Sequence, residues 1–249
     1  MDKLNMLIGT KNENQYAIDL NKHSIALGTV QSGKTLHIKR MINVIKESKR
    51  NKNIIVFSKL IQDKTIENNV FESIDTYSDV EKFLLFIKEI NLEIDIRKDE
   101  VHKYHTKSIS ELEKSKKIDY NVNNTLNDIY IIIDDISILY SQIKNKNKYK
   151  AEKFINNLKR IIKLGESLNI FLHITGYNVS LDMLLNNDKK NKQSYAFEQI
   201  ILFNDLAKFN HAQKIYTIDE NINKSIELYE NVLFFEKDKF ILIDKISNK

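Results

Sequence analysis

Residues 28–35 read Gly28-Thr29-Val30-Gln31-Ser32-Gly33-Lys34-Thr35, and this run fits the pattern G-x-x-x-x-G-K-[ST] of a phosphate-binding loop. Two glycines at that spacing let backbone N–H groups turn inward and approach phosphate oxygens closely. The chain of 249 residues has only five glycines, where average usage would give about seventeen. The placement of two of them in one motif is therefore informative. We expect the whole loop, together with Leu36, to contact a nucleotide.

The residues on either side of the loop predict a strand before it and a helix after it. Residues 24–27 form a short apolar run that is typical of a buried strand. Downstream, apolar residues recur at helical spacing, at Leu36, Ile38, Met41, Ile42 and Ile45. Strand, glycine loop and helix is the order that such a loop requires. Lys34 would then reach the β- and γ-phosphates, the Thr35 hydroxyl would ligate Mg²⁺, and the positive end of the helix would attract the anion.

A second apolar run ends in two carboxylates. Residues 129–133 are rich in isoleucine and are followed directly by Asp134 and Asp135. A buried central strand delivers such a carboxylate to the carboxyl edge of a parallel sheet. We therefore expect Asp134 to help hold Mg²⁺, as the Walker B aspartate does, and Asp135 to orient or deprotonate the attacking water. The alternative is a strand that ends in an ordinary aspartate-rich turn.

The rest of the chain predicts strands that alternate with helices. Strands are expected at 53–58, 169–176, 196–203 and 213–218, and helices at 78–106 and 151–168. Residues 4–20 predict two short strands with a turn, and residues 231–236 and 239–244 predict a hairpin. The polar segment 107–127 predicts an excursion or a helix end, and the segments 144–148 and 188–192 predict charged, solvated loops. This alternation indicates an α/β fold with a mostly parallel central sheet and helices on both faces.

Composition excludes several classes of function. The chain has no cysteine, so it has no disulfide, no cysteine-ligated zinc and no thiol nucleophile. It has no apolar run near the roughly 18 residues of a membrane span. The net charge of +5 comes almost entirely from lysine, which favours a solvated surface over a nucleic-acid track. His23, before the loop strand, and His37, in the following helix, are predicted to be structural.

Together these motifs resemble the FtsK/SpoIIIE branch of P-loop ATPases. The resemblance depends on His23 shortly before the loop, on the strand that ends in acid, and on the later strand that leads to Thr175. It covers roughly residues 7–205 and implies a RecA-like P-loop NTPase fold with ATP and Mg²⁺ as ligands. The loop ending Gln-Ser-Gly-Lys-Thr and the pair Asp134-Asp135 are most similar to the C-terminal ATPase modules of the type VII secretion coupling proteins EssC and EccC.

That resemblance implies that residues 1–249 form a single ATPase domain, one module of a larger membrane-anchored protein. The module would couple recognition or export of small helical secreted proteins to ATP, on the cytoplasmic side of the cell membrane. Neighbouring ATPase domains or protomers would be further partners. The segment itself is expected to be soluble and not inserted in the membrane. The alternative is a DNA-translocating or plasmid-transfer ATPase of the same family, with Lys144–Lys153 as its basic loop, although nucleic acid is the less favoured partner.

Departures from the family pattern imply weak hydrolysis. Asp135 stands where the family has a glutamate, so its carboxylate lies one methylene further back, and a displacement of about 1 Å can cost on the order of 10²-fold in rate. Gly176 stands where the family often has a glutamine that senses the γ-phosphate. No arginine is assigned as a trans-acting finger. Lys34 and Asp135 are the expected catalytic residues, yet the isolated module is expected to turn over slowly or not at all. A module that only binds nucleotide is the third interpretation.

Overall fold

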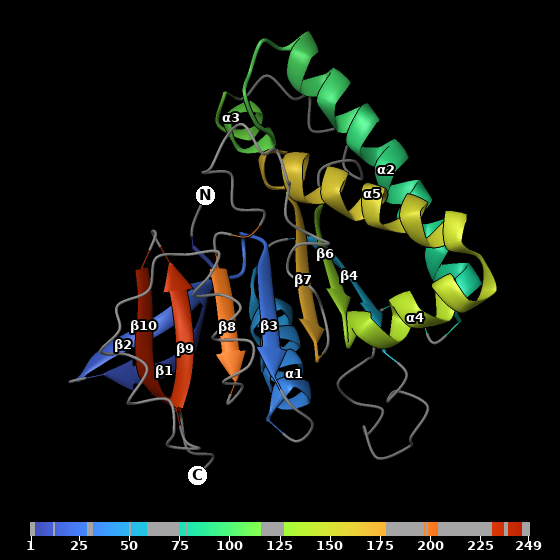
Figure 1. The fold of residues 1–249 in the computed structure, drawn as a ribbon. Coiled ribbons are helices and arrows are strands. Elements are labelled where there is room, and N and C mark those ends of the chain that lie inside the picture. The colour runs from blue at the N-terminus through green and yellow to red at the C-terminus, as the bar shows by residue number, and fades with distance from the viewer. Residues whose placement is uncertain are drawn as a thin grey trace.

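The described residues form one mixed sheet of ten strands with helices packed on it (Figure 1). The computed structural model describes residues 3–11, 13–28, 32–49, 51–58, 75–77, 79–115, 127–177, 197, 199–203, 231–236 and 239–245. The strands are β1 (Asn5–Lys11), β2 (Asn14–Asp19), β3 (Ser24–Gly28), β4 (Lys52–Phe57), β5 (Asp75–Tyr77), β6 (Asp128–Ile133), β7 (Ile170–Gly176), β8 (Gln199–Phe203), β9 (Asn231–Glu236) and β10 (Lys239–Lys245). The helices are α1 (Lys34–Glu47), α2 (Val80–Lys103), α3 (Ile109–Lys114), α4 (Ile136–Lys146) and α5 (Lys148–Leu164), with a 3₁₀ turn, η2, at Glu166–Leu168.

The parallel half of the sheet has the order β8-β3-β7-β6-β4-β5. Strand β7 therefore lies between β3, which leads to the phosphate-binding motif, and β6, which leads to the two aspartates. Ile174 of β7 pairs with Ile25 of β3 on one side and with Ile133 of β6 on the other. Because these strands are parallel and in this register, the residues that follow them emerge at one edge of the sheet.

The remaining strands extend the sheet in antiparallel fashion. Strand β9 pairs with β8 and with β10, and β10 pairs with β1, whose other neighbour is β2. The first two strands of the chain are thus joined to the sheet through the last one. The predicted hairpin at residues 231–244 and the predicted strand pair within residues 4–20 are both confirmed.

Helices cover both faces of the sheet. On one face, inward strand residues such as Ile25, Ile131 and Leu172 pack against α2, α3, α4 and α5. On the other face, residues such as Ala26 and Ile132 pack against α1 and against the inward residues of β1 and β2. Figure 1 shows α2 and α5 alongside one another, with α1 apart from them beside β3. The predicted α/β arrangement, with helices on both faces, is confirmed.

The sequence missed or misplaced several elements. Residues 144–148 are not a loop, because α4 runs to Lys146 and α5 begins at Lys148, with Asn147 alone between them. Helices α3 and α4 and the short strand β5 were not predicted. The predicted strand at 213–218 and the charged loop at 188–192 lie outside the described residues. Within the described part of the chain, no helix is long and apolar enough to span a bilayer.

Candidate functional site

Both glycines of the motif have a structural reason. Gly33 is the N-cap of α1 and has φ 99°, in the left-handed region that residues with a side chain rarely adopt. Gly28 lies against β8, where a Cβ atom would be 2.6 Å from Ser32 Oγ and 2.7 Å from Phe203 Cβ. No side chain fits in that space without displacing its neighbours. Thr29, Val30 and Gln31 lie outside the described residues. The structure therefore describes the loop at its two ends, at Gly28 and from Ser32 onward.

The amino-terminal end of α1 carries positive charge. Lys34 is the first helical residue, and its ammonium group donates a hydrogen bond to the Gly28 carbonyl oxygen at 2.7 Å. The Lys34 side chain therefore folds back toward Gly28, at the other end of the motif. The first turn of α1 contains no acidic residue, so no carboxylate within that turn offsets the partial positive charge of the helix end. Lys34, Thr35 and Leu36 are all partly exposed at this position.

Asp134 is held from both sides at the end of β6. Ser58, which follows β4, donates its hydroxyl hydrogen bond to Asp134 Oδ2 at 2.8 Å. Thr175, near the end of β7, donates to Asp134 Oδ1 at 3.1 Å. The Asp134 backbone N–H also donates to the Phe57 carbonyl at 2.8 Å. Strands β4 and β7, the two neighbours of β6, thus fix both the backbone and the carboxylate of this residue.

Several groups act on the charge of Asp134. Burial is the largest effect and leaves the pKa of Asp134 raised above its ordinary value, although the hydrogen bonds from Ser58 and Thr175 lower it. The neighbouring charge of Asp135 raises the pKa again, whereas the charge of Lys34 lowers it. The charge of Lys34 therefore favours the ionised carboxylate, as the smallest of these effects. The structure brings together the lysine of the motif and the aspartate of β6, which lie a hundred residues apart in the sequence.

Asp135 is the N-cap of α4. Its Oδ1 accepts hydrogen bonds from the backbone N–H groups of Ser137 at 3.2 Å and Ile138 at 3.4 Å. Its own N–H donates to Thr175 Oγ1 at 3.0 Å, and its φ of 55° lies in the left-handed region. The sequence did not reveal this capping role. Asp135 still lies beside Asp134 at the same edge of the sheet.

Ser58 is a residue of this site that the sequence analysis missed. The strand at 53–58 was predicted, but its last residue was not connected with Asp134. Ser58 can be identified by its position, because it is a hydroxyl residue directly after the carboxyl end of β4, which is parallel and adjacent to β6. It is only 4% exposed, so its hydroxyl is part of the interior of the site.

Three buried histidines surround β3. His23 Nδ1 accepts a hydrogen bond from the Leu172 N–H at 2.9 Å, and His173 Nδ1 lies 2.8 Å from Ser24 Oγ. The His37 ring packs edge-on against Phe203, with centroids 5.6 Å apart. Burial lowers the pKa of His23 and of His173 to about 3 and that of His37 to about 4. These rings are neutral at pH 7 and packed in the interior, which agrees with the structural role predicted for His23 and His37.

The residues present fit a magnesium–nucleotide ligand. Within the part of the chain that the structure describes, no group of three or more histidine, aspartate or glutamate side chains converges on a metal position. Mg²⁺ in phosphate sites needs no such cage, because one or two carboxylates, phosphate oxygens and waters complete its shell. Asp134 would supply a carboxylate and Thr35 a hydroxyl, and the close-packed Gly28 with the left-handed Gly33 would provide backbone for phosphate oxygens.

Known structures match nearly the whole chain. The pCW3 conjugation coupling protein TcpA, in its monomer form with ATPγS, matches 98% of the chain and 66% of its own length, with TM-score 0.75 and 15% identity. The cytoplasmic domain of the Thermomonospora curvata type VII secretion ATPase EccC matches 98% of the chain and 28% of its own length, with TM-score 0.67 and 14% identity. ATPases 2 and 3 of EssC from Geobacillus thermodenitrificans match 97% of the chain and 44% of their own length, with TM-score 0.63 and 16% identity.

The chain has the fold of the FtsK/SpoIIIE-like P-loop ATPases. The predicted resemblance and the RecA-like fold class are therefore confirmed. No protein-family model matches the sequence, and no curated protein matches it. The chain spans between 28% and 66% of the length of these three structures. At identities of 14–16% the likeness concerns the fold, and the chemistry has to be argued from the site.

Proposed function

We propose that this chain binds ATP with Mg²⁺ and hydrolyses it weakly, as a module of a type VII protein secretion ATPase. One observation carries the nucleotide site. Strands β3 and β6, on either side of β7, bring Lys34 and Asp134 to the same edge of the sheet. Burial raises the pKa of Asp134, and the charge of Lys34 acts in the opposite direction by favouring the ionised carboxylate. A lysine that reaches phosphates beside a carboxylate that holds Mg²⁺ is the arrangement that phosphoryl transfer in P-loop NTPases uses.

Each residue of the site then has a defined task. The motif from Gly28 to Leu36 binds the phosphates, with Lys34 on the β- and γ-phosphates and Thr35 on the metal. Asp134 holds the metal, directly or through water. Asp135 is the group that orients the attacking water, with the shorter side chain as the reason for slow turnover. Mg²⁺, when bound, supplies charge neutralisation at the phosphates.

The secretion role rests on the proteins that share the fold. EccC is a type VII secretion ATPase, and the EssC structure comprises ATPases 2 and 3 of its chain. A structure of ATPases 2 and 3 of Thermomonospora curvata EccC holds a signal sequence peptide. By analogy, we expect neighbouring ATPase domains and helical secreted proteins as partners of this chain, on the cytoplasmic side of the membrane. The domain boundaries 1–249 are part of the same proposal.

The test of the nucleotide site is a titration of a fluorescent ATP analogue against wild type and Lys34→Ala, with Lys39→Ala as the control. Lys39 lies on the same helix, five residues further on. We expect Lys34→Ala to lose binding by about 100-fold or more, because an ionic contact to the phosphates disappears, and Lys39→Ala to bind as wild type does. Both variants should keep the circular dichroism spectrum of the wild type. Equal affinity in all three proteins would rule out this site.

Two observations favour a second function, in plasmid or DNA transfer. The structure of the conjugation coupling protein TcpA has a higher TM-score than the EccC and EssC structures. In addition, the junction of α4 and α5 is basic and exposed. Its exposed lysines lie at 144, 146, 148 and 153, whereas Lys150, between them, pairs with Glu81 at 2.9 Å. Tyr149, in the same run, is 72% exposed, and lysines with an exposed aromatic ring suit a nucleic-acid strand.

Oligonucleotide binding separates the two functions. A quadruple Lys→Gln variant at positions 144, 146, 148 and 153 is compared with a control at positions 82, 88, 98 and 103 of α2. All eight lysines are exposed, and both variants change the charge equally. If the chain moves DNA, a labelled oligonucleotide binds the wild type and the control, and the junction variant loses affinity and salt dependence. No binding to wild type, or equal losses in both variants, would argue against DNA transfer through this junction.

A further inference from the structure

Ser58 and Thr175 hold the two oxygens of Asp134 from opposite sides. The hydroxyl of Ser58 reaches Oδ2 from the end of β4, and that of Thr175 reaches Oδ1 from β7. Ser58 and Thr175 are 4% and 2% exposed, and Asp134 is 9% exposed. Water therefore has little access to these contacts. With one donor on each oxygen, the plane of the carboxylate is fixed.

This arrangement leaves the carboxylate able to bind a metal. A carboxylate oxygen has two lone pairs, and one hydrogen bond uses only one of them. The hydroxyl groups therefore orient both oxygens without occupying all of their acceptor positions. Groups that orient a metal ligand in this way contribute to metal affinity although they do not touch the metal, and their loss typically costs roughly 10- to 100-fold in affinity.

The hydroxyl of Ser58 acts separately from the backbone contact beside it. The Asp134 N–H donates to the carbonyl of Phe57, and that hydrogen bond does not depend on which side chain follows at position 58. Replacing Ser58 with alanine thus keeps the pairing of β4 with β6 and removes the donor to Oδ2. The carboxylate would then be held on the Thr175 side alone and could turn about its χ2 bond.

We propose that Ser58 is a positioning residue, which orients the Asp134 carboxylate for Mg²⁺ and thereby sets the metal dependence of nucleotide binding. This inference rests on the proposed function, because it requires that Asp134 serves the metal of a bound nucleotide. It extends the proposed nucleotide site to the end of β4, beyond the phosphate-binding motif and Asp134. A merely structural serine would affect folding stability and leave the response to metal unchanged.

The test measures affinity for a fluorescent ATP analogue over a range of Mg²⁺ concentrations and in EDTA, for wild type, Ser58→Ala and Ser58→Thr. We expect Ser58→Ala to raise the Mg²⁺ concentration for half-maximal binding by about tenfold. Its affinity in EDTA should stay within about twofold of wild type, since phosphate contacts from the motif are intact. Ser58→Thr keeps the hydroxyl and should restore most of the metal response.

Ser24→Ala is the matched control. Ser24 is a serine on the neighbouring part of the sheet, 2% exposed, and its hydroxyl lies 2.8 Å from His173 Nδ1. Its loss removes a buried hydroxyl contact of the same length at the opposite end of β3, away from Asp134. We expect Ser24→Ala to lose stability comparably and to keep the wild-type Mg²⁺ dependence.

Two results would overturn the inference, and a third concerns the proposed function. An unchanged Mg²⁺ dependence in Ser58→Ala would show that Ser58 does not position the metal ligand. An equal shift in Ser24→Ala would show that the effect is one of general stability. If wild type binds no nucleotide, or binds it equally in Mg²⁺ and EDTA, the proposed magnesium–nucleotide site fails, whatever the variants show.

Discussion

Asp135 caps a helix, and its proposed role in orienting water would be a second task for the same side chain. Its Oδ1 caps α4 by accepting from the N–H groups of Ser137 and Ile138, and its side chain also lies next to Asp134. A cap of this kind contributes about 1 kcal/mol to stability. The shorter side chain of aspartate suits capping, since aspartate is among the preferred N-cap residues and glutamate is not. The proposed catalytic role and the capping role therefore favour different side chains at this position.

The first prediction separates these roles by substitution. Asp135→Asn keeps the cap and removes the charge, so we expect nearly wild-type stability and a further loss of ATP hydrolysis. Asp135→Ala removes both, and its unfolding free energy should fall by about 1 kcal/mol. Asp135→Glu should raise the hydrolysis rate, because the carboxylate extends by one methylene, while it weakens the cap. Phosphate-release assays and urea denaturation measure the two properties, and a lower rate in Asp135→Glu would exclude the role in orienting water.

For single residues, the phosphate-binding motif makes most of the candidate nucleotide site predictable from the sequence. Gly28, Gly33 and Lys34 are identified by their spacing, and Asp134 by its place after an apolar run. Ser58 could not be found in this way, because its role depends on which strand lies beside β6. The cap at Asp135 was equally hidden, since the left-handed φ of that residue and the helix after it are properties of the folded chain.

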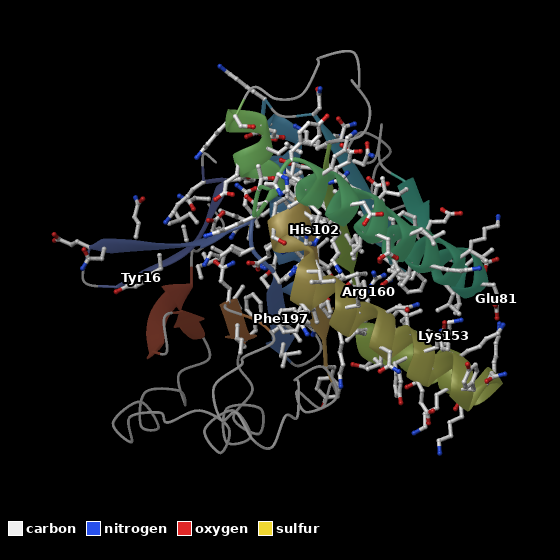
Figure 2. All side chains as sticks on the ribbon, turned by 90° about the horizontal axis from the view of Figure 1, so that it is seen from above. Tyr16, Glu81, His102, Lys153, Arg160 and Phe197 are labelled. Atoms are coloured by element: carbon white, nitrogen blue, oxygen red, sulfur yellow. The ribbon has the colours of Figure 1, made fainter. Side chains whose placement is uncertain are left out.

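A buried arginine attaches the long helix α2 to the sheet. Arg97, 3% exposed, donates from Nη1 to the Leu168 carbonyl at 2.8 Å and from Nη2 to the Asn127 carbonyl at 2.9 Å. Its Nε pairs with Glu93 at 2.7 Å. Asn127 precedes β6 and Leu168 precedes β7, so one guanidinium group joins α2 to the entry of two central strands. Arg160 of α5, labelled in Figure 2, also bonds to α2, through the Asn91 carbonyl and Asp95, but its side chain is 35% exposed.

The second prediction compares these arginines. Arg97→Lys should lower the unfolding free energy by about 3 kcal/mol, because the compact ammonium group of lysine cannot reach the three separated acceptors that the planar guanidinium spans. Arg160→Lys keeps a cation near the exposed Asp95 and should lower the unfolding free energy by less than about 1 kcal/mol. Chemical denaturation of the two variants at the same pH measures the difference. Similar losses would mean that the buried arrangement around Arg97 adds nothing beyond a surface ion pair.

Element boundaries were hardest to predict where one residue serves two helices. Asn147 ends α4 and caps α5, with its side chain accepting from the Lys150 N–H at 3.0 Å. The surrounding lysines and asparagines are typical of a loop, so composition favoured the wrong assignment. The apolar spacing of Ile136, Leu139 and Ile143 is the signal for α4, and it follows directly on a buried strand.

Across the whole molecule, the histidines around β3 make stability depend on pH. His23, His37 and His173 have pKa values lowered by burial to about 3, 4 and 3. In the unfolded chain they take up protons near their ordinary pKa of about 6.5. Between these values the unfolded state binds more protons than the folded state, so their contribution to stability is complete above about pH 6.5 and is lost as the pH falls toward 4.

The third prediction follows from that difference. At pH 5 each of the three histidines should lower the free energy of unfolding by about 2 kcal/mol relative to pH 7.5. This is a large part of the roughly 5–15 kcal/mol by which a typical domain is stable. Urea denaturation at the two pH values measures the loss. His37→Leu should reduce the loss, whereas His102→Gln, at an exposed position of α2, should leave it unchanged. Equal pH dependence in wild type and His37→Leu would show that His37 does not contribute.

The fold class was predictable because strands alternate with helices, and that alternation requires crossover connections between parallel strands. The strand order was not predictable in the same way. The sequence indicates that strands exist near both ends of the chain, but it does not show that β1 pairs with β10 rather than with β3, which follows it more closely. Long-range pairing of this kind leaves no short pattern in the sequence.

The pairing of β1 with β10 has a consequence for the order of events during synthesis on the ribosome. The β1–β2 hairpin leaves the exit tunnel well before β10, the second backbone partner of β1, has been synthesised. Until residues 239–245 emerge, β1 exposes a row of N–H and C=O groups to other nascent chains. Contacts with α1, which is synthesised soon afterwards and packs against the same hairpin, are what would shelter it in the meantime.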